Sequence, residues 1–189
     1  MLRIVGGKHR GRTIATPEGT TTRPTSNRAR EALFNILTHA NWRPDGTSPL
    51  IDARVLDAFA GSGALGLEAL SRGAAHATFL DSDATAIKLI GDNLRKLGET
   101  ATARVVRADA TRPPPAREAC DLVFLDPPYR SGLAASALVA LAAAGWLQPG
   151  AIATIELARA EDLPPPPRFE ALDERRYGAA KIVILRYAS

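Results

Sequence analysis

The sequence predicts an α/β fold in which a doubly wound, mostly parallel sheet is covered by helices. Two observations carry this prediction. From Arg54 onward, apolar runs of strand length alternate with segments of helical periodicity, which is the pattern of repeated βαβ units. A glycine-rich run, Gly61 to Gly66, falls between the first of these strands and the first of these helices, where the ligands of parallel sheets commonly bind. The 189 residues provide for one such domain.

The first 24 residues are expected to form a small basic β-hairpin arm, followed by a domain at residues 25–189. Residues 2–5 and 12–15 are short β-prone runs, and the glycines between them suit a turn. Residues 1–30 hold seven lysines and arginines against one glutamate, whereas the remainder is slightly acidic. A concentrated basic arm is typical of a protein that meets phosphates at one end. Alternatively, these residues form a solvated charged tail that binds no nucleic acid.

The remaining elements follow in order. Thr25 or Ser26 can cap a helix whose apolar stripe runs to Ala40. Arg28, Arg30 and Glu31 lie off this stripe. Residues 41–53 are expected to form a connection. Strands are expected near 54–59, 76–81, 103–107, 121–125 and 151–157, and helices near 63–72, 84–97 and 133–144. The prolines at 113–115 and 164–167 indicate loops. Residues 169–177 and 181–187 suit an antiparallel C-terminal hairpin that closes the sheet edge.

Composition argues against a membrane protein and against a secreted one. No stretch approaches the roughly 18 to 20 apolar residues of a membrane span. The first seven residues lack the apolar block of a signal, and Cys120 is the only cysteine, so a cytoplasmic setting is expected. His9, His39 and His76 stand apart, so we expect no metal site. Nothing in the sequence requires more than a monomer.

The run from Asp57 to Gly66 predicts a nucleotide-like cofactor. Its glycines let the backbone approach a ligand, and the helix that follows offers free N–H groups. Asp81 lies twenty residues after Gly61, where a carboxylate that binds ribose hydroxyls is expected. The motif therefore fits a nicotinamide dinucleotide as well as it fits other nucleotide-like cofactors. Asp57 favours S-adenosylmethionine, because a carboxylate at this position attracts an ammonium group and would repel a pyrophosphate. Asp57 could instead cap a turn, and Asp81 could merely start the next helix, of which we expect Asp83 to be the cap.

The segment Asp126-Pro127-Pro128-Tyr129 directly follows an apolar strand and should face the same crevice. Two successive prolines keep the backbone out of a helix, so their carbonyls stay free to accept hydrogen bonds from an amino group. Tyr129 supplies a flat face for a base that has left its stack. If Asp126 and a proline carbonyl accept both N–H bonds of an aryl amine, its lone pair is aimed at the methyl group. A rigid turn is the alternative.

Together these motifs resemble the amino-group branch of Rossmann-like methyltransferases. The N-terminal motifs are similar to those of the RsmD-type 16S ribosomal RNA (guanine-N2)-methyltransferases of bacteria, and the similarity runs over essentially the whole chain. The N-terminal motifs are Arg3-Ile4-Val5-Gly6-Gly7, Arg10-Gly11-Arg12, Arg23-Pro24-Thr25 and Arg28-x-Arg30-Glu31-x-Leu33-Phe34-Asn35.

The resemblance implies a class I enzyme that methylates the exocyclic N2 amine of a guanine in 16S ribosomal RNA of the small subunit. S-adenosylmethionine would be the methyl donor and S-adenosylhomocysteine the product. Asp81 stands where many relatives carry glutamate, which shortens the reach to the ribose. The implied cofactor contacts are Asp57, Phe59, Gly61, Gly63, Asp81, Asp109 and Ala110, and the implied catalytic residues are Asp126, Pro127, Pro128 and Tyr129. The residues expected to bind RNA phosphates are Lys8, Arg10, Arg12, Arg23 and Arg28.

Three other functions fit part of the sequence. A DNA adenine-N6 methyltransferase shares the Asp126–Tyr129 chemistry, but no inserted block is large enough to read a duplex sequence. An NAD-dependent oxidoreductase explains the glycines and leaves Asp126–Tyr129 and the basic arm without a purpose. A noncatalytic RNA-binding module would need only the arm.

Overall fold

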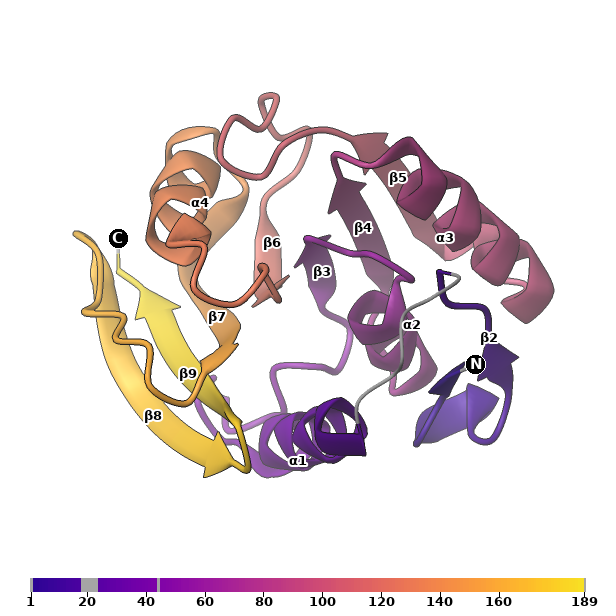
Figure 1. The fold of residues 1–189 in the computed structure, drawn as a ribbon, viewed down its shortest axis with the longest axis horizontal. Helices are drawn as coiled ribbons and strands as arrows, with labels where there is room; N and C mark the ends of the chain where they lie inside the picture. The colour runs from indigo at the N-terminus through magenta and orange to yellow at the C-terminus, as the bar shows by residue number, and fades with distance from the viewer. Residues whose placement is uncertain (1, 18–23, 44, 189) are drawn as a thin grey trace.

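The computed structural model describes residues 2–17, 24–43 and 45–188, and its centre is a sheet with helices on both faces (Figure 1). The strands of this sheet are β3 (Arg54–Ala58), β4 (His76–Asp81), β5 (Ala103–Arg107), β6 (Cys120–Leu125), β7 (Leu147–Ala158), β8 (Phe169–Tyr177) and β9 (Ala180–Tyr187). Their spatial order is β5-β4-β3-β6-β7-β9-β8. The first five in this order run parallel, and β9 is antiparallel to both of its neighbours. The predicted doubly wound, mostly parallel sheet with an antiparallel C-terminal hairpin is confirmed.

Helices cover the two faces unequally. The long helices are α1 (Pro24–His39), α2 (Ala64–Ser71), α3 (Ala84–Leu97) and α4 (Leu133–Ala143). Apolar residues of α1, α2 and α3 pack with Val55, Phe79 and Phe124 on one face of the sheet. Those of α4 pack with Leu56 and Val123 on the other. Alternate residues of β3 therefore enter different cores, as the two-residue period of a strand requires.

Most predicted bounds are confirmed to within one residue, and the exceptions have physical reasons. The helix α3 spans 84–97 as expected, because Asp83 caps it by accepting a hydrogen bond from the Thr85 N–H at 3.0 Å. The helix α1 begins at Pro24, so the predicted cap at Thr25 or Ser26 was wrong. Proline suits a first helical position because its φ is already helical.

The strand β7 is longer than predicted. It begins at Leu147, four residues early, because Leu147 pairs with Cys120 ahead of an irregularity in the ladder between β6 and β7. A proline and a glycine at 149–150 lie within this early part of the strand. Within the described ranges, no helix is long and apolar enough to cross a membrane.

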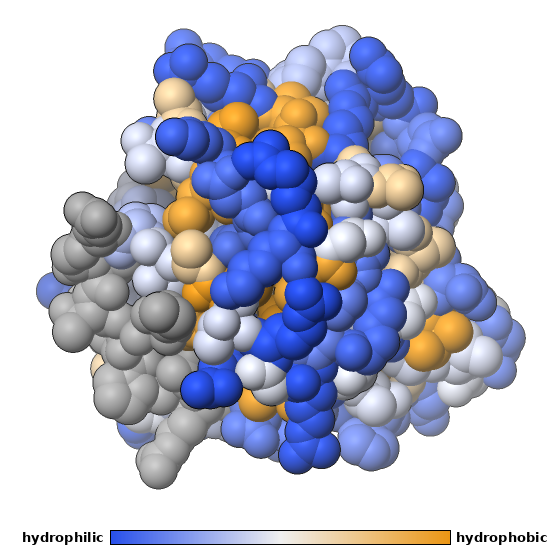
Figure 2. All heavy atoms as spheres, turned by 90° about the vertical axis from the view of Figure 1, so that its right-hand side faces the viewer, coloured by the Kyte–Doolittle hydropathy of each residue, from blue (hydrophilic) through white to orange (hydrophobic). Residues whose placement is uncertain are grey.

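The expected N-terminal hairpin is present and is docked on the body. Its strands are β1 (Leu2–Arg3) and β2 (Thr13–Ile14), joined across the short helix η1 (Gly7–His9). The fully buried carboxylate of Glu68, on α2, accepts hydrogen bonds from the N–H groups of Val5 at 2.9 Å and Gly6 at 2.8 Å. The side of the molecule that carries α3 and the hairpin is mostly hydrophilic (Figure 2). A domain boundary at residue 24 stays a prediction.

Candidate active site

A crevice opens at the carboxyl ends of the central parallel strands. The strands β3 and β6 are adjacent and in register, with Asp57 opposite Phe124 and Ala58 opposite Leu125. The loops that follow these two strands are therefore neighbours, as predicted. Between them lies a cavity of about 280 Å³. Its walls are formed by Leu2, Arg30, Asp57, Phe59, Ala60, Gly61, Ser62, Ala64, Leu65, Asp126 and Glu156.

Asp57 presents a buried carboxylate to this cavity. The residue is 1% exposed, and its Oδ2 accepts a hydrogen bond from the Gly66 N–H at 2.9 Å. Burial raises the pKa of Asp57 to about 7; the Gly66 hydrogen bond opposes this rise and the nearby charge of Asp81 adds to it. Ionised Asp57 lacks a cationic partner in the described chain, so a positively charged ligand group would suit it.

The glycine-rich loop after β3 is held in a sharp turn. Phe59 has φ 71°, a strained value for a side chain of this size, and Gly63 has φ 79° at the start of α2. Gly66 has a different purpose, because a Cβ there would lie 2.4 Å from the Phe79 ring. It allows α2 to pack closely on the sheet.

Asp81 shapes the same loop from the end of β4. Its Oδ2 accepts the Gly61 N–H at 2.8 Å and its Oδ1 accepts the Asp83 N–H at 2.9 Å. Both oxygens are thus in use within the chain, and Asp81 does not line the cavity. Contact between Asp81 and a ribose stays a prediction, and it would add to these bonds or replace one of them.

The Asp126–Tyr129 segment supplies the other wall. Asp126 lines the cavity and is exposed to solvent there. The protein atoms packed near its carboxyl, together with the charges of Glu156 and Asp57, raise its pKa. The Pro128 carbonyl accepts the Ser131 N–H at 3.2 Å. The Tyr129 hydroxyl donates to Oε1 of Glu156 at 2.6 Å, which fixes the ring beside the cavity.

Two charged residues of the cavity were not predicted as site residues. Glu156 comes from β7, and its burial raises its pKa, although the Tyr129 hydrogen bond and the charge of Arg30 oppose the rise. Arg30 comes from α1 and is only 8% exposed despite lying off the predicted apolar stripe. The signal for Glu156 was present, because it is the single charge within the apolar run 151–158. Arg30 has no comparable signal among the neighbouring arginines.

The predicted contacts at Asp109 and Ala110 lie at the same sheet edge but outside the cavity lining. The Ala108 N–H donates to the Asp81 carbonyl at 2.9 Å, which brings this loop beside the end of β4. The Asp109 carboxylate accepts from the hydroxyl of Thr111 at 2.7 Å and from its N–H at 2.8 Å, and these bonds lower the pKa of Asp109. Ala110 is buried. Their place beside an adenine stays a prediction.

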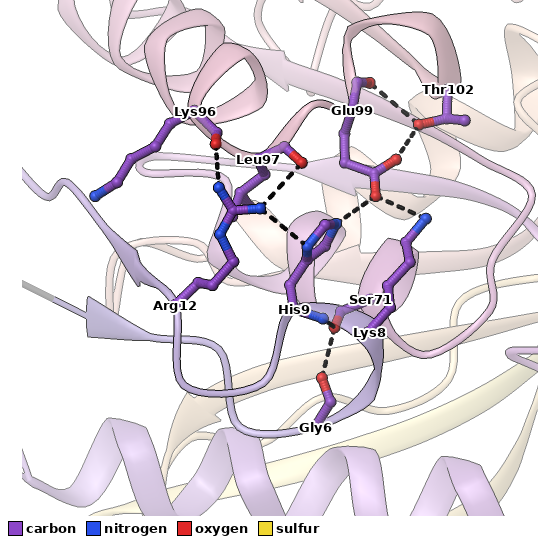
Figure 3. Close-up of polar contacts among 9 residues, drawn as sticks. All are labelled: Gly6, Lys8, His9, Arg12, Ser71, Lys96, Leu97, Glu99 and Thr102. Atoms are coloured by element: carbon purple, nitrogen blue, oxygen red, sulfur yellow. Dashed lines mark hydrogen bonds and ion pairs between the residues drawn. The ribbon is translucent and has the colours of Figure 1, made fainter.

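The predicted RNA-binding cations are used in different ways, as Figure 3 shows for the hairpin. Lys8 pairs with buried Glu99 at 2.7 Å, and Arg12 donates to the Lys96 and Leu97 carbonyls at the end of α3. Burial would raise the pKa of Glu99, but hydrogen bonds from Lys8, Thr102 and His9 lower it. Arg10 is exposed. Arg23 lies outside the described residues, and so does the side chain of Arg28.

Comparisons with known proteins point to one family. The model of the family described as conserved hypothetical protein 95 matches residues 2–186. Ribosomal RNA small subunit methyltransferase D of Escherichia coli K12 is 40% identical over 167 residues, 88% of this chain and 79% of that protein. The Haemophilus influenzae protein of the same name is 36% identical over 182 residues, 94% of this chain and 89% of that one. The solved structure of Escherichia coli yhhF has a TM-score of 0.82 at 36% identity, covering 99% of this chain and 98% of that one.

Proposed function

Because this chain belongs to the family described as conserved hypothetical protein 95, we propose that it transfers a methyl group from S-adenosylmethionine to the exocyclic N2 amine of a guanine in 16S ribosomal RNA. The relatives named ribosomal RNA small subunit methyltransferase D support the RNA substrate. The observation that carries the proposal is the shared cavity, in which Asp57 and the glycine-rich loop face Asp126 from neighbouring strands.

The residues of the cavity fit this cofactor. Asp57 uses one oxygen for the Gly66 N–H and keeps the other for an ammonium group. The first residues of α2, Ala64 and Leu65, line the cavity and present a helix N-terminus to it. When bound, S-adenosylmethionine supplies a methyl carbon whose bond to a positively charged sulfur breaks as a nucleophile attacks.

Asp126 and a proline carbonyl would orient the amine. The Pro128 carbonyl is engaged by Ser131, so we assign the second acceptor to Pro127. With both N–H bonds accepted, the nitrogen lone pair points at the methyl group, and orientation supplies much of the rate. As the new nitrogen–carbon bond forms, one N–H proton must leave. Asp126 can receive it, because its raised pKa makes it a stronger base than an ordinary aspartate.

The test is methyl transfer from labelled S-adenosylmethionine to small ribosomal subunits that lack this modification, with duplex DNA in parallel. Digestion to nucleosides then identifies the methylated base. We expect label in N2-methylguanosine and none in DNA. Label in N6-methyladenine of the duplex would preserve the chemistry of Asp126 and overturn the proposed substrate. Absence of transfer, with thermal stabilisation by NADH and not by S-adenosylmethionine, would favour an oxidoreductase.

A further inference from the structure

The cavity wall contains a buried cation whose hydrogen bonds are incomplete. Arg30 reaches the cavity from α1, and its Nη2 donates to the Arg3 carbonyl at 2.9 Å. Its Nε is shielded from water and has no hydrogen-bond partner in the described part of the chain. A buried N–H without an acceptor loses its hydrogen bond to water and gains none in return, which is unfavourable. An unsatisfied guanidinium beside an open cavity therefore indicates a missing acceptor.

The carboxylates around Arg30 are engaged elsewhere. Glu68 binds Arg72 Nε at 2.7 Å as well as the hairpin backbone, and Glu156 accepts from Tyr129. Among the described residues Arg30 forms no ion pair within 4.0 Å. Burial lowers the pKa of Arg30, and the charge of Arg72 acts in the same direction, while Glu68 and Glu156 oppose this change. The guanidinium is thus desolvated, and apart from its hydrogen bond to the Arg3 carbonyl it is stabilised by charges at a distance.

We propose that Arg30 binds the α-carboxylate of the methionine part of S-adenosylmethionine, opposite Asp57, which binds the α-ammonium group. This inference rests on the proposed function, since it concerns the same cofactor. Arg30 and Asp57 line one cavity and carry opposite charges, which is the complement of an amino-acid zwitterion. The guanidinium would turn its Nε edge to the carboxylate, so that two parallel N–H groups meet two oxygens.

The other charges of the cavity favour this ligand over an RNA phosphate. Asp57, Asp126 and Glu156 all line the same space as Arg30. A polyanionic backbone entering there would meet three carboxylates for one guanidinium. A carboxylate that arrives with an ammonium and a sulfonium on the same molecule meets a matching set of charges.

The hairpin also takes part in this arrangement. Leu2 lines the cavity, and the carbonyl of Arg3 accepts a hydrogen bond from Nη2 of Arg30. Both residues belong to β1, and the N–H groups of Val5 and Gly6, which follow this strand, bind Glu68 of α2. The N-terminal segment therefore positions a cofactor-binding residue, in addition to any contact that it makes with RNA.

The test compares the affinities of S-adenosylmethionine and its decarboxylated analogue by calorimetry, for the wild type, Arg30→Gln and Arg30→Lys. Arg95→Gln is the matched control, because Arg95 is an exposed arginine on α3 that pairs with Asp92. Loss of a charge-assisted hydrogen bond pair predicts about 10- to 100-fold weaker S-adenosylmethionine binding by Arg30→Gln. The decarboxylated analogue should bind Arg30→Gln at least as well as it binds the wild type. The control should keep both wild-type affinities.

The ratio of the two affinities is the decisive quantity. If Arg30→Gln weakens both ligands equally, or neither, Arg30 does not bind the carboxylate and the inference is overturned while the cofactor stands. If the wild type binds neither ligand, the proposed function fails as well. Arg30→Lys provides a second test in case Arg30→Gln does not fold, because lysine keeps the positive charge but cannot form the bidentate hydrogen bonds. It should lose several-fold affinity for S-adenosylmethionine alone, and an unchanged affinity ratio in this variant would also overturn the proposal.

Discussion

Asp57→Asn should stabilise the ligand-free protein, and more so at high pH than at low pH. The pKa of this carboxyl rises from 3.8 to about 7 on folding, so the folded state loses stability as the pH climbs between these values. Integrating this shift, the raised pKa of Asp57 opposes folding by at most about 4 kcal/mol near pH 8 and about 2 kcal/mol near pH 5. Asparagine is uncharged at both, and its amide oxygen can still accept the Gly66 N–H.

Urea denaturation of wild type and variant at these two pH values measures the effect directly. The variant's gain in unfolding free energy should be larger at the higher pH by about 2 to 3 kcal/mol. An equal gain at both pH values would mean that the pKa of Asp57 is not raised in the folded protein. Addition of S-adenosylmethionine should stabilise the wild type and leave Asp57→Asn almost unchanged, since the ammonium group loses its partner.

Three further variants test other parts of the molecule. Asp126→Ala should keep its affinity for S-adenosylmethionine and lose turnover by about 100-fold or more in the methyl-transfer assay; full activity would refute its proposed role. Glu68→Ala leaves the Val5 and Gly6 N–H groups without an acceptor and should lower the unfolding free energy by about 2 to 4 kcal/mol. A loss below about 0.5 kcal/mol would show that Glu68 does not anchor the hairpin. The double variant Arg10→Ala/Arg12→Ala should bind RNA with a shallower salt dependence, and an unchanged slope would remove these residues from the interface.

Local signals explain why most of the fold could be predicted. The helix α3 has an aspartate cap at Asp83, apolar residues at helical spacing and Gly98 with φ 76° after its last turn. Each of these signals acts within a few residues of sequence, and together they define both ends of the helix. The Asp126–Tyr129 segment was predictable for a related reason, because it directly follows a buried strand.

The residues that sequence reasoning missed depend on contacts between distant segments. Glu68 lies on an apolar helix, and its purpose becomes clear only when Val5 and Gly6, more than 60 residues away in sequence, donate to it. Arg30 resembles its neighbouring arginines until α1 docks against the hairpin. Lys8 and Arg12 were expected to serve RNA, yet their partners at Glu99 and the end of α3 lie more than 80 residues along the chain. No local pattern encodes such pairings.

The position of β9 has a consequence for how the protein is made. This strand, residues 180–187, lies between β7 and β8 and is buried along most of its length. During synthesis, β7 and β8 emerge first and have no partner for the backbone groups that β9 will later pair. The apolar edge of β7 therefore stays open until nearly all of this sequence has left the ribosome. The sheet is completed by an insertion, and a nascent chain stalled before residue 180 would expose a surface that recruits chaperones.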